Sequence, residues 1–332
     1  MTRKIIFVTG GAGFIGSNIV AKLAEDPSLD VVVCDWLHEA ELGKWRNIAK
    51  HPIGDFVAPE NMFEWLEKRW RDVELVIHMG AVSSTTEPDA DKIVHSNFTL
   101  SRDLFRWCAD RQRRFIYASS AATYGDASEF DDRDDFESLS ALRPLNTYGW
   151  SKALFDIFAV RQAARDYAPP QWVGLKFFNV YGPNEEHKHS MKSVASQIWP
   201  KVRDGHAVQL FKSYRDGVPD GGQTRDFVYV RDVADVVAWL GDSEQVNGVY
   251  NLGSGQARTF EDMAKAVFAA AGRTPQIEYT AMPPAIRDKY QYFTQANMSR
   301  LRAAGYDKPF TSLEDGVAAY VHDHLATSDP YR

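Results

Sequence analysis

The first sixteen residues constrain the fold most, because an apolar run is followed at once by regularly spaced glycines. "KIIFVT" is typical of a strand, and "GGAGFIGS" places Gly10, Gly13 and Gly16 three residues apart ahead of a helical pattern. Such a turn lets backbone approach a pyrophosphate at the N-terminus of the helix. Asp35 ends the next apolar run about twenty residues later, where a carboxylate can accept hydrogen bonds from ribose hydroxyls. We therefore expect a dinucleotide-binding site on this strand–turn–helix unit.

Short β-branched runs alternate with helical patterns as far as Pro183, which is typical of an α/β protein with a doubly wound parallel sheet, the Rossmann fold. Strands are predicted at 4–9, 30–35, 74–80, 114–120 and 172–180, and helices near 15–25, 91–111 and 147–167. Beyond Pro183 the alternation weakens, with a helix near 191–203 and a strand at 207–211. We expect a dinucleotide-binding domain over 1–178, to which segments at about 228–254 and 296–312 return, and a smaller α+β substrate-binding domain over most of 179–332.

Charge and hydropathy exclude several classes of partner. A net charge of -7 argues against nucleic acid and anionic membranes, which need a basic face. The longest apolar runs fall far short of the roughly 20 residues that cross a membrane, and the N-terminus enters a strand without a signal-like segment. We expect a cytoplasmic protein. Cys34 and Cys108 lie in apolar surroundings without metal-ligand spacing, so we interpret both as reduced core residues.

The stretch "NTYGWSK" carries a candidate catalytic pair. Tyr148 and Lys152 are four residues apart and therefore share one face of a helix. The lysine and a positive nicotinamide ring would favour the phenolate and pull the pKa of Tyr148 towards neutrality, making it a base for a substrate hydroxyl during hydride transfer. The alternative is an exposed pair on a surface helix. Ser120 favours catalysis, because "YASS" places it at the carboxyl edge of a strand, where ligands bind in open α/β sheets.

The identity of the dinucleotide stays open on the residues alone. Asp35 favours NAD, because a carboxylate repels a 2'-phosphate. Lys44, and less directly Arg46, could offset that charge and admit NADP.

These motifs resemble the extended short-chain dehydrogenase/reductase family and, within it, the epimerases that act at C6 of an ADP-linked heptose. The likeness runs over nearly the whole chain, through "GGAGFIGSNIV", "SSTTE", "YASSAATYG", "FNVYGP", "RDFVYV" and "LRAAGYDKPF". The resemblance implies conversion of ADP-D-glycero-D-manno-heptose to its L-glycero epimer by transient oxidation and re-reduction with bound NADP, in the synthesis of the heptose donor of the lipopolysaccharide inner core. It also implies a homo-oligomer, a pentamer in this family.

The resemblance assigns roles position by position. It implies a catalytic set of Ser120, Tyr148 and Lys152, with Lys188 as a second acid/base. The implied substrate contacts are Asn179, Ser190, Phe211, Arg225 and Tyr290. The implied cofactor contacts, with Gly10, Gly13, Gly16 and Lys152, are Phe14, Ile15, Asp35, Trp36, Lys44, Met79, Gly80, Ala81, Ser83 and Val180. Three positions depart from the family pattern: Trp36 replaces an expected Asn, Met79 an expected Glu and Pro59 an expected Lys.

Lys188 stands between two histidines in "EEHKHSM", which leaves three interpretations. His187 and His189 could bind a metal, but no nearby carboxylate or cysteine cluster completes the ligand spacing, so we expect no metal site. Without the family resemblance, a solvated lysine would be the preferred interpretation. With it, Lys188 is expected at the rim of the substrate cleft, acting on a side that Tyr148 does not reach.

Three other functions are compatible with parts of the sequence. An NAD-dependent 4-epimerase of the same family is the nearest, although Lys188 has no obvious use in it. A 4,6-dehydratase is disfavoured, because Ala121 and Ala122 follow Ser120 where such enzymes carry acids. A catalytically silent dinucleotide sensor predicts a broken Tyr/Lys pair, whereas Tyr148 and Lys152 are both present.

Overall fold

A large parallel sheet organises the chain, of which the computed structural model describes residues 4–37, 43–85, 87–287 and 290–332. Seven strands of this described part lie side by side, and every pairing between neighbours is parallel. Their spatial order is β10 (Gly248–Leu252), β6 (Trp172–Phe177), β5 (Arg114–Ser120), β4 (Val73–His78), β1 (Lys4–Thr9), β2 (Leu29–Cys34) and β3 (Asp55–Val57). The Rossmann fold predicted from the sequence is confirmed.

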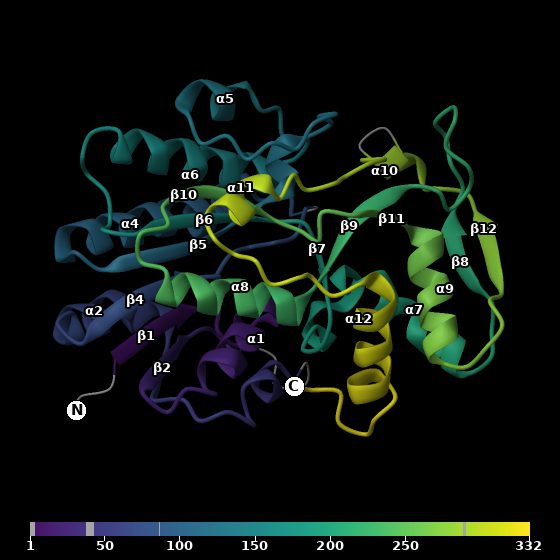
Figure 1. Cartoon of the computed structure of the whole chain (residues 1–332), viewed down its shortest axis with the longest axis horizontal. Helices are drawn as coiled ribbons and strands as arrows, with labels where there is room; N and C mark the ends of the chain where they lie inside the picture. Colours follow the sequence, from purple (N-terminus) through teal and green to yellow (C-terminus); the bar gives the residue numbers. More distant parts are fainter. Residues whose placement is uncertain (1–3, 38–42, 86, 288–289) are drawn as a thin grey trace.

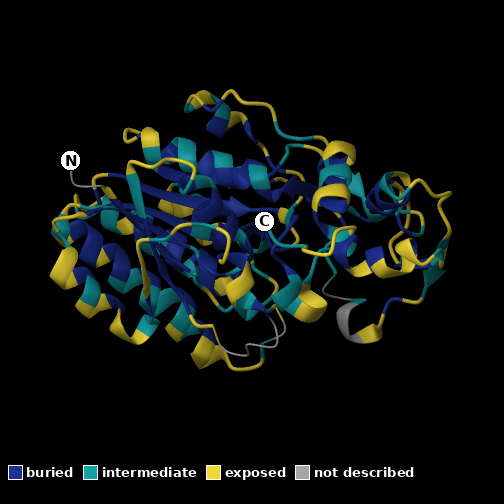
Figure 2. Ribbon diagram, turned by 90° about the horizontal axis from the view of Figure 1, so that it is seen from below, coloured by how far each residue is buried: buried dark blue, intermediate teal, exposed yellow. Residues whose placement is uncertain are grey.

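The sheet is buried on both faces, which explains its apolar strands. In β1, Ile6 and Val8 face one hydrophobic cluster while Ile5 and Phe7 face another. A parallel strand covered by helices on both sides needs such a near-continuous apolar sequence. Figure 2 shows the consequence, with buried residues along the strands and exposed ones on the outer faces of the helices.

Helices cover the two faces of the large sheet (Figure 1). On one face lie α1 (Phe14–Leu23) and α8 (Val230–Asp242), whose apolar residues join the first cluster. On the other lie α2 (Met62–Arg69), α4 (Leu100–Arg111) and α6 (Thr147–Ala163), which share the second cluster. No helix among the described residues combines the length and the apolar run that crossing a membrane requires.

Two smaller sheets and three helices form a second region, seen on the right of Figure 1. Strands β7 (Asn179–Tyr181), β9 (Thr224–Tyr229) and β11 (Ala257–Thr259) form one sheet, and β8 (Val208–Phe211) pairs in parallel with β12 (Ile277–Thr280). Helices α7 (Val194–Arg203), α9 (Phe260–Ala270) and α12 (Leu313–Tyr320) pack around a third hydrophobic cluster. The remaining short elements are η2 (Lys44–Asn47), η3 (Pro59–Asn61), α3 (Ala90–Ile93), η4 (Val94–Thr99), η5 (Ala121–Tyr124), α5 (Phe136–Ala141), η6 (Glu186–Met191), α10 (Pro284–Arg287), α11 (Ser299–Ala303) and η7 (Val321–Leu325).

One predicted element was wrong in a way that matters for the site. The single strand expected over 172–180 is two strands, because β6 ends at Phe177 and β7 begins at Asn179 in a different sheet. The chain thus leaves the large sheet and enters the smaller one within two residues. Later segments return, since β10 pairs with β6, and Met298 and Leu301 join the first hydrophobic cluster. The domain boundary near residue 178 stays a prediction.

Candidate active site

The glycine-rich turn joins β1 to α1 and is pressed against the end of β4. Gly10 has a φ of 64°, and a Cβ on it would lie 2.6 Å from the backbone nitrogen of Gly80. A Cβ on Gly16 would lie 2.1 Å from the carbonyl oxygen of Gly10. Helix α1 begins after Gly13 without a side-chain cap in the described chain. Only glycine allows this closeness, and the exposed helix N-terminus suits an anionic pyrophosphate, so the turn fits a dinucleotide.

Asp35 follows β2 and braces this turn. Its carboxylate accepts hydrogen bonds from the backbone nitrogens of Ala12 (2.9 Å) and Trp36 (2.8 Å). Lys44 pairs with the same carboxylate at 2.6 Å and also donates to the carbonyl oxygen of Trp36. The negative charge at the ribose end of the turn is therefore already offset by a cation, as the sequence suggested.

The other predicted cofactor positions surround the turn at different depths. Phe14 is buried at the start of α1, and Ile15 packs against the first cluster. Met79, Gly80, Ala81 and Ser83 follow β4, with Ala81 and Ser83 exposed. Trp36 is exposed and its indole donates to Glu60 at 2.5 Å. Val180 lies in β7 of the smaller sheet, yet it packs against the same first cluster.

Ser120 and Tyr148 meet where β5 ends and α6 begins. Ser120 is the last residue of β5, and its hydroxyl accepts from the backbone nitrogen of Ala122 at 3.1 Å. Tyr148 lies in the first turn of α6, close enough to Ser120 for the serine side chain to lower the pKa of the tyrosine. Gly149 makes the approach possible, because a Cβ there would lie 2.5 Å from the carbonyl oxygen of Ala122. The structure thus brings the predicted serine and tyrosine together.

Lys152 lies one turn further along α6 and is almost fully buried. Its ammonium donates to the carbonyl oxygen of Ala118 at 2.8 Å. Burial lowers the pKa of Lys152 to about 8, while the charge of Asp156 raises it. Burial raises the pKa of Tyr148, and the Ser120 side chain lowers it. Our expectation combined Lys152 with a positive nicotinamide ring in pulling this pKa towards neutrality, and it stays a prediction for the protein with its dinucleotide bound.

Lys188 lies on η6, beside the start of α1 that follows the glycine turn. Its ammonium is 4.8 Å from the centroid of the Phe14 ring, and it has no hydrogen bond or ion pair within the described residues. Burial lowers the pKa of Lys188, and the charge of Glu185 raises it. Glu185 is itself fully buried, where it accepts hydrogen bonds from Ser193 and Tyr320. A half-buried, unpaired lysine beside the cofactor turn is placed to accept or donate a proton.

The two histidines beside Lys188 have different environments. His187 lies within hydrogen-bond distance of Asn47, at 3.2 Å, and burial lowers its pKa to about 4. His189 is exposed and has a φ of 48°, which is unusual for a residue with a side chain. Groups of three or more metal-binding side chains are absent from the described part of the chain.

Three predicted substrate contacts converge in the second region. Arg225 on β9 is buried, with its guanidinium 5.2 Å from the centroid of the Tyr290 ring and 5.5 Å from that of Phe260. Phe211 meets Tyr290 edge to face, with ring centroids 6.4 Å apart. Aromatic rings around a buried guanidinium provide both stacking surface and charge for a nucleotide diphosphate.

The last two predicted substrate contacts are exposed. Ser190 follows Lys188 by two residues on η6. Asn179 begins β7 and lies in register with Phe227 of β9. Both therefore lie on segments that also carry other predicted site residues.

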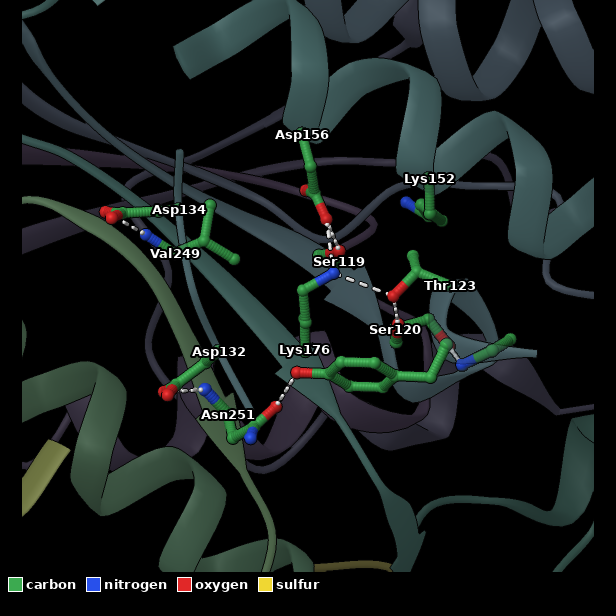
Figure 3. A network of polar contacts seen from close by, with 12 residues as sticks. Ser119, Ser120, Thr123, Asp132, Asp134, Lys152, Asp156, Lys176, Val249 and Asn251 are labelled. Atoms are coloured by element: carbon green, nitrogen blue, oxygen red, sulfur yellow. Dashed lines mark hydrogen bonds and ion pairs between the residues drawn. The ribbon is translucent and has the colours of Figure 1, made fainter. Parts of the chain in front are cut away.

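Sequence reasoning missed a buried charged pair behind the catalytic set. Lys176 of β6 and Asp156 of α6 are fully buried and form an ion pair at 2.8 Å (Figure 3). The signal was present, because Lys176 interrupts the apolar run "WVGLKFF" and Asp156 stands four residues after Lys152. A lysine in a strand buried on both faces needs a partner.

A parallel sheet with a glycine-rich first turn and a Ser–Tyr–Lys set at its carboxyl edge defines a class of enzymes that work with a nicotinamide dinucleotide. The chain belongs to the NAD dependent epimerase/dehydratase family, whose sequence pattern matches residues 6–253. It is 47% identical over 327 residues to ADP-L-glycero-D-manno-heptose-6-epimerase of Nitratidesulfovibrio vulgaris, covering 98% of this chain and 99% of that one.

Solved structures give the same picture. The fold matches the crystal structure of ADP-L-glycero-D-manno-heptose-6-epimerase from Helicobacter pylori with a TM-score of 0.79 and 28% identity, covering 96% of each chain. It also matches UDP-glucose 4-epimerase from Thermus thermophilus in complex with NAD, with a TM-score of 0.73, 26% identity and coverage of 98% and 99%. The resemblance inferred from the sequence is confirmed.

Proposed function

We propose that the protein inverts C6 of ADP-D-glycero-D-manno-heptose to give the L-glycero epimer. The observation that supports the proposal is the presence of two separate titratable side chains, Tyr148 on α6 and Lys188 on η6. Tyr148 lies near Ser120, the last residue of β5, and Lys188 lies over Phe14 at the start of α1. The names of the relatives at 47% identity support the substrate.

NADP is the cofactor we propose for this site, with NAD as the alternative. Gly10, Gly13 and Gly16 would hold the pyrophosphate, and Lys44, already paired with Asp35, would face the 2'-phosphate. A bound dinucleotide would supply reversible hydride transfer, which allows C6 to be oxidised to a ketone and reduced again from its opposite face. The solved relatives in complex with NAD support the dinucleotide but not the phosphate.

The chain's own residues move the protons. In one direction Tyr148 Oη accepts the proton of the C6 hydroxyl, with Ser120 orienting it and the positive charge of Lys152 favouring the phenolate. Lys188 Nζ donates the proton that completes the epimer. In the reverse direction the two groups exchange roles, which requires that both lie on the substrate and on different sides of it.

The second region would hold the rest of the substrate. Arg225 clamps the diphosphate, while Phe211 and Tyr290 pack against the nucleotide. Asn179 and Ser190 contact the heptose. A homo-oligomer and a cytoplasmic location stay predictions.

The test is incubation of the purified protein with ADP-D-glycero-D-manno-heptose, with UDP-glucose as the comparison. We expect a product of unchanged mass whose NMR spectrum shows inversion at C6, and no change in UDP-glucose. Inversion at C4 of UDP-glucose would instead favour the 4-epimerase, and inertness towards both would favour a dinucleotide sensor. Identification of the nucleotide released on denaturation separates NADP from NAD.

A further inference from the structure

A fully buried carboxylate lies between two buried ammonium groups behind Tyr148. Asp156 of α6 follows Lys152 by one helical turn, and Lys176 reaches it from β6 at 2.8 Å. The neighbourhood holds one negative charge and two positive charges, all nearly inaccessible to water. Buried charges interact strongly, so the charges of Asp156 and Lys176 bear on the protonation of Lys152.

Asp156 also clamps β5 on both sides of the residue that Lys152 contacts. Its carboxylate accepts hydrogen bonds from Tyr117 (3.0 Å) and Ser119 (2.7 Å). Lys152 donates to the carbonyl oxygen of Ala118 between them. Three bonds from one face of α6 therefore fix the end of β5, immediately before Ser120.

Lys176 fixes the chain on the other side of Ser120. It is in register with Ser119 on the neighbouring strand, and its ammonium donates to the hydroxyl of Thr123 at 2.7 Å. Thr123 in turn donates to the carbonyl oxygen of Ser120 at 2.8 Å. Figure 3 shows the resulting path from Asp156 through Lys176 and Thr123 to Ser120.

We propose that Asp156 and Lys176 are positioning residues that hold Ser120 in place and act on the protonation of Lys152. Asp156 favours the protonated form of Lys152, and Lys176 favours the neutral form. This inference rests on the proposed function of Tyr148 and Lys152. The charge of Asp156, on the same helix, raises the pKa of Lys152, and the charge of Lys152 in turn lowers that of His78 on β4. Tyr117 of β5 and Lys176 of β6 both contact Asp156 and so face Lys152 across this carboxylate. His78 is neutral at working pH, because burial lowers its pKa to about 3.

The sign of each effect follows from the charges. Asp156→Asn removes the negative charge that stabilises protonated Lys152, so its pKa falls by about one unit. Lys176→Met removes a competing positive charge, so the pKa of Lys152 rises. A role in structure alone would weaken activity in both variants without moving the pKa in opposite directions.

The experiment reads the pKa of Lys152 from the NMR signal of its ¹³Cε atom, assigned with Lys152→Met, and the pH dependence of kcat. We expect opposite shifts of both in Asp156→Asn and Lys176→Met, a wild-type profile in Lys176→Arg, and a partial return in the double variant. The double variant also limits misfolding, since neither member of the Lys176–Asp156 ion pair is left buried without the other. Asp232→Asn, a buried carboxylate that accepts from Thr311, serves as the control and should leave the profile unchanged.

Unshifted values in both variants, or shifts in the same direction, would overturn the inference. Failure of the proposed function would show differently. Tyr148→Phe would then keep full activity. The NMR signal of Lys152 would still report how Asp156 and Lys176 affect its pKa.

Discussion

Helix α6 and the segment η6 each present a lysine to the proposed site, and the two lysines lie in opposite kinds of environment. Lys152 is almost fully buried, donates to a backbone carbonyl and lies one turn from a buried carboxylate. Lys188 is half-buried over an aromatic ring, and its ammonium has no hydrogen-bond partner in the described chain. A lysine held by bonds is suited to provide a fixed charge, and one without bonds is suited to exchange a proton.

The two lysines also depend on different parts of the fold. Lys152 is anchored to the large sheet through α6 and β5. The η6 segment is anchored through Glu185 to Ser193, at the start of α7, and to Tyr320 on α12. Correct placement of Lys188 therefore requires the second region, whereas placement of Lys152 requires only the first.

The largest expected effect comes from removing the two proposed proton carriers. Lys188→Met and Tyr148→Phe should each keep the cofactor and lose epimerisation by ~10²–10⁴-fold, because each group serves one half of the reaction. Turnover of ADP-D-glycero-D-manno-heptose, followed by NMR, measures the loss. A Lys188→Met enzyme with near-normal turnover would return this lysine to a solvent-facing role.

A substrate that needs only one hydride transfer would distinguish the role of Lys188 from that of Tyr148. On an aldehyde analogue that needs only one hydride transfer, the two variants should differ, since each retains one working group. Chelators should leave both unaffected. If a chelator abolished activity and zinc restored it, the result would instead indicate a metal site at His187 and His189.

Arg225 tests whether the second region contributes binding as well as placement. Arg225→Ala should weaken substrate binding by about 2–5 kcal/mol, since a buried guanidinium facing a diphosphate loses a desolvated charge pair. Cofactor content should not change. Arg258→Ala is a matched control, because Arg258 lies opposite Arg225 on β11 but is already paired with Glu314 at 2.6 Å. An unaltered KM for Arg225→Ala would remove this arginine from the site.

The sequence predicted the first region better than the second, for a physical reason. Gly10, Asp35 and the Tyr148–Lys152 pair belong to local patterns whose spacing follows from one turn or one helix. Asp226 shows what such patterns miss: its carboxylate accepts from Ser254, Gly255 and Ala296, all distant in sequence. The ion pair of Lys176 with Asp156 is missed for the same reason, because only the packing of α6 on the sheet brings the two together.

Acid should destabilise the first region through His78, which is fully buried between Thr9 and Ser101. Burial lowers its pKa from 6.5 to about 3, so the unfolded chain binds a proton there that the folded chain does not. Stability should therefore fall as the pH drops below 6.5, by about 2 kcal/mol between pH 7 and pH 5 from this residue. Urea unfolding of His78→Gln should show a shallower pH dependence, while replacing the exposed His206 should not. Equal slopes in all three proteins would contradict this.

The smallest effect separates the two lysines most directly. Glu185→Gln removes the carboxylate whose charge raises the pKa of Lys188, so that pKa should fall further below its ordinary value, by about one unit. The limb of the pH profile that Lys188 governs should then move to lower pH, while the pKa of Lys152 stays unchanged because Asp156, not Glu185, lies beside it. Glu186→Gln is the control, since that neighbouring carboxylate is paired with Lys192 at 3.1 Å. A profile that moves equally in both variants would mean that Glu185 acts only through the overall charge of the segment, and that the lysine of η6 is not tuned separately from the lysine of α6.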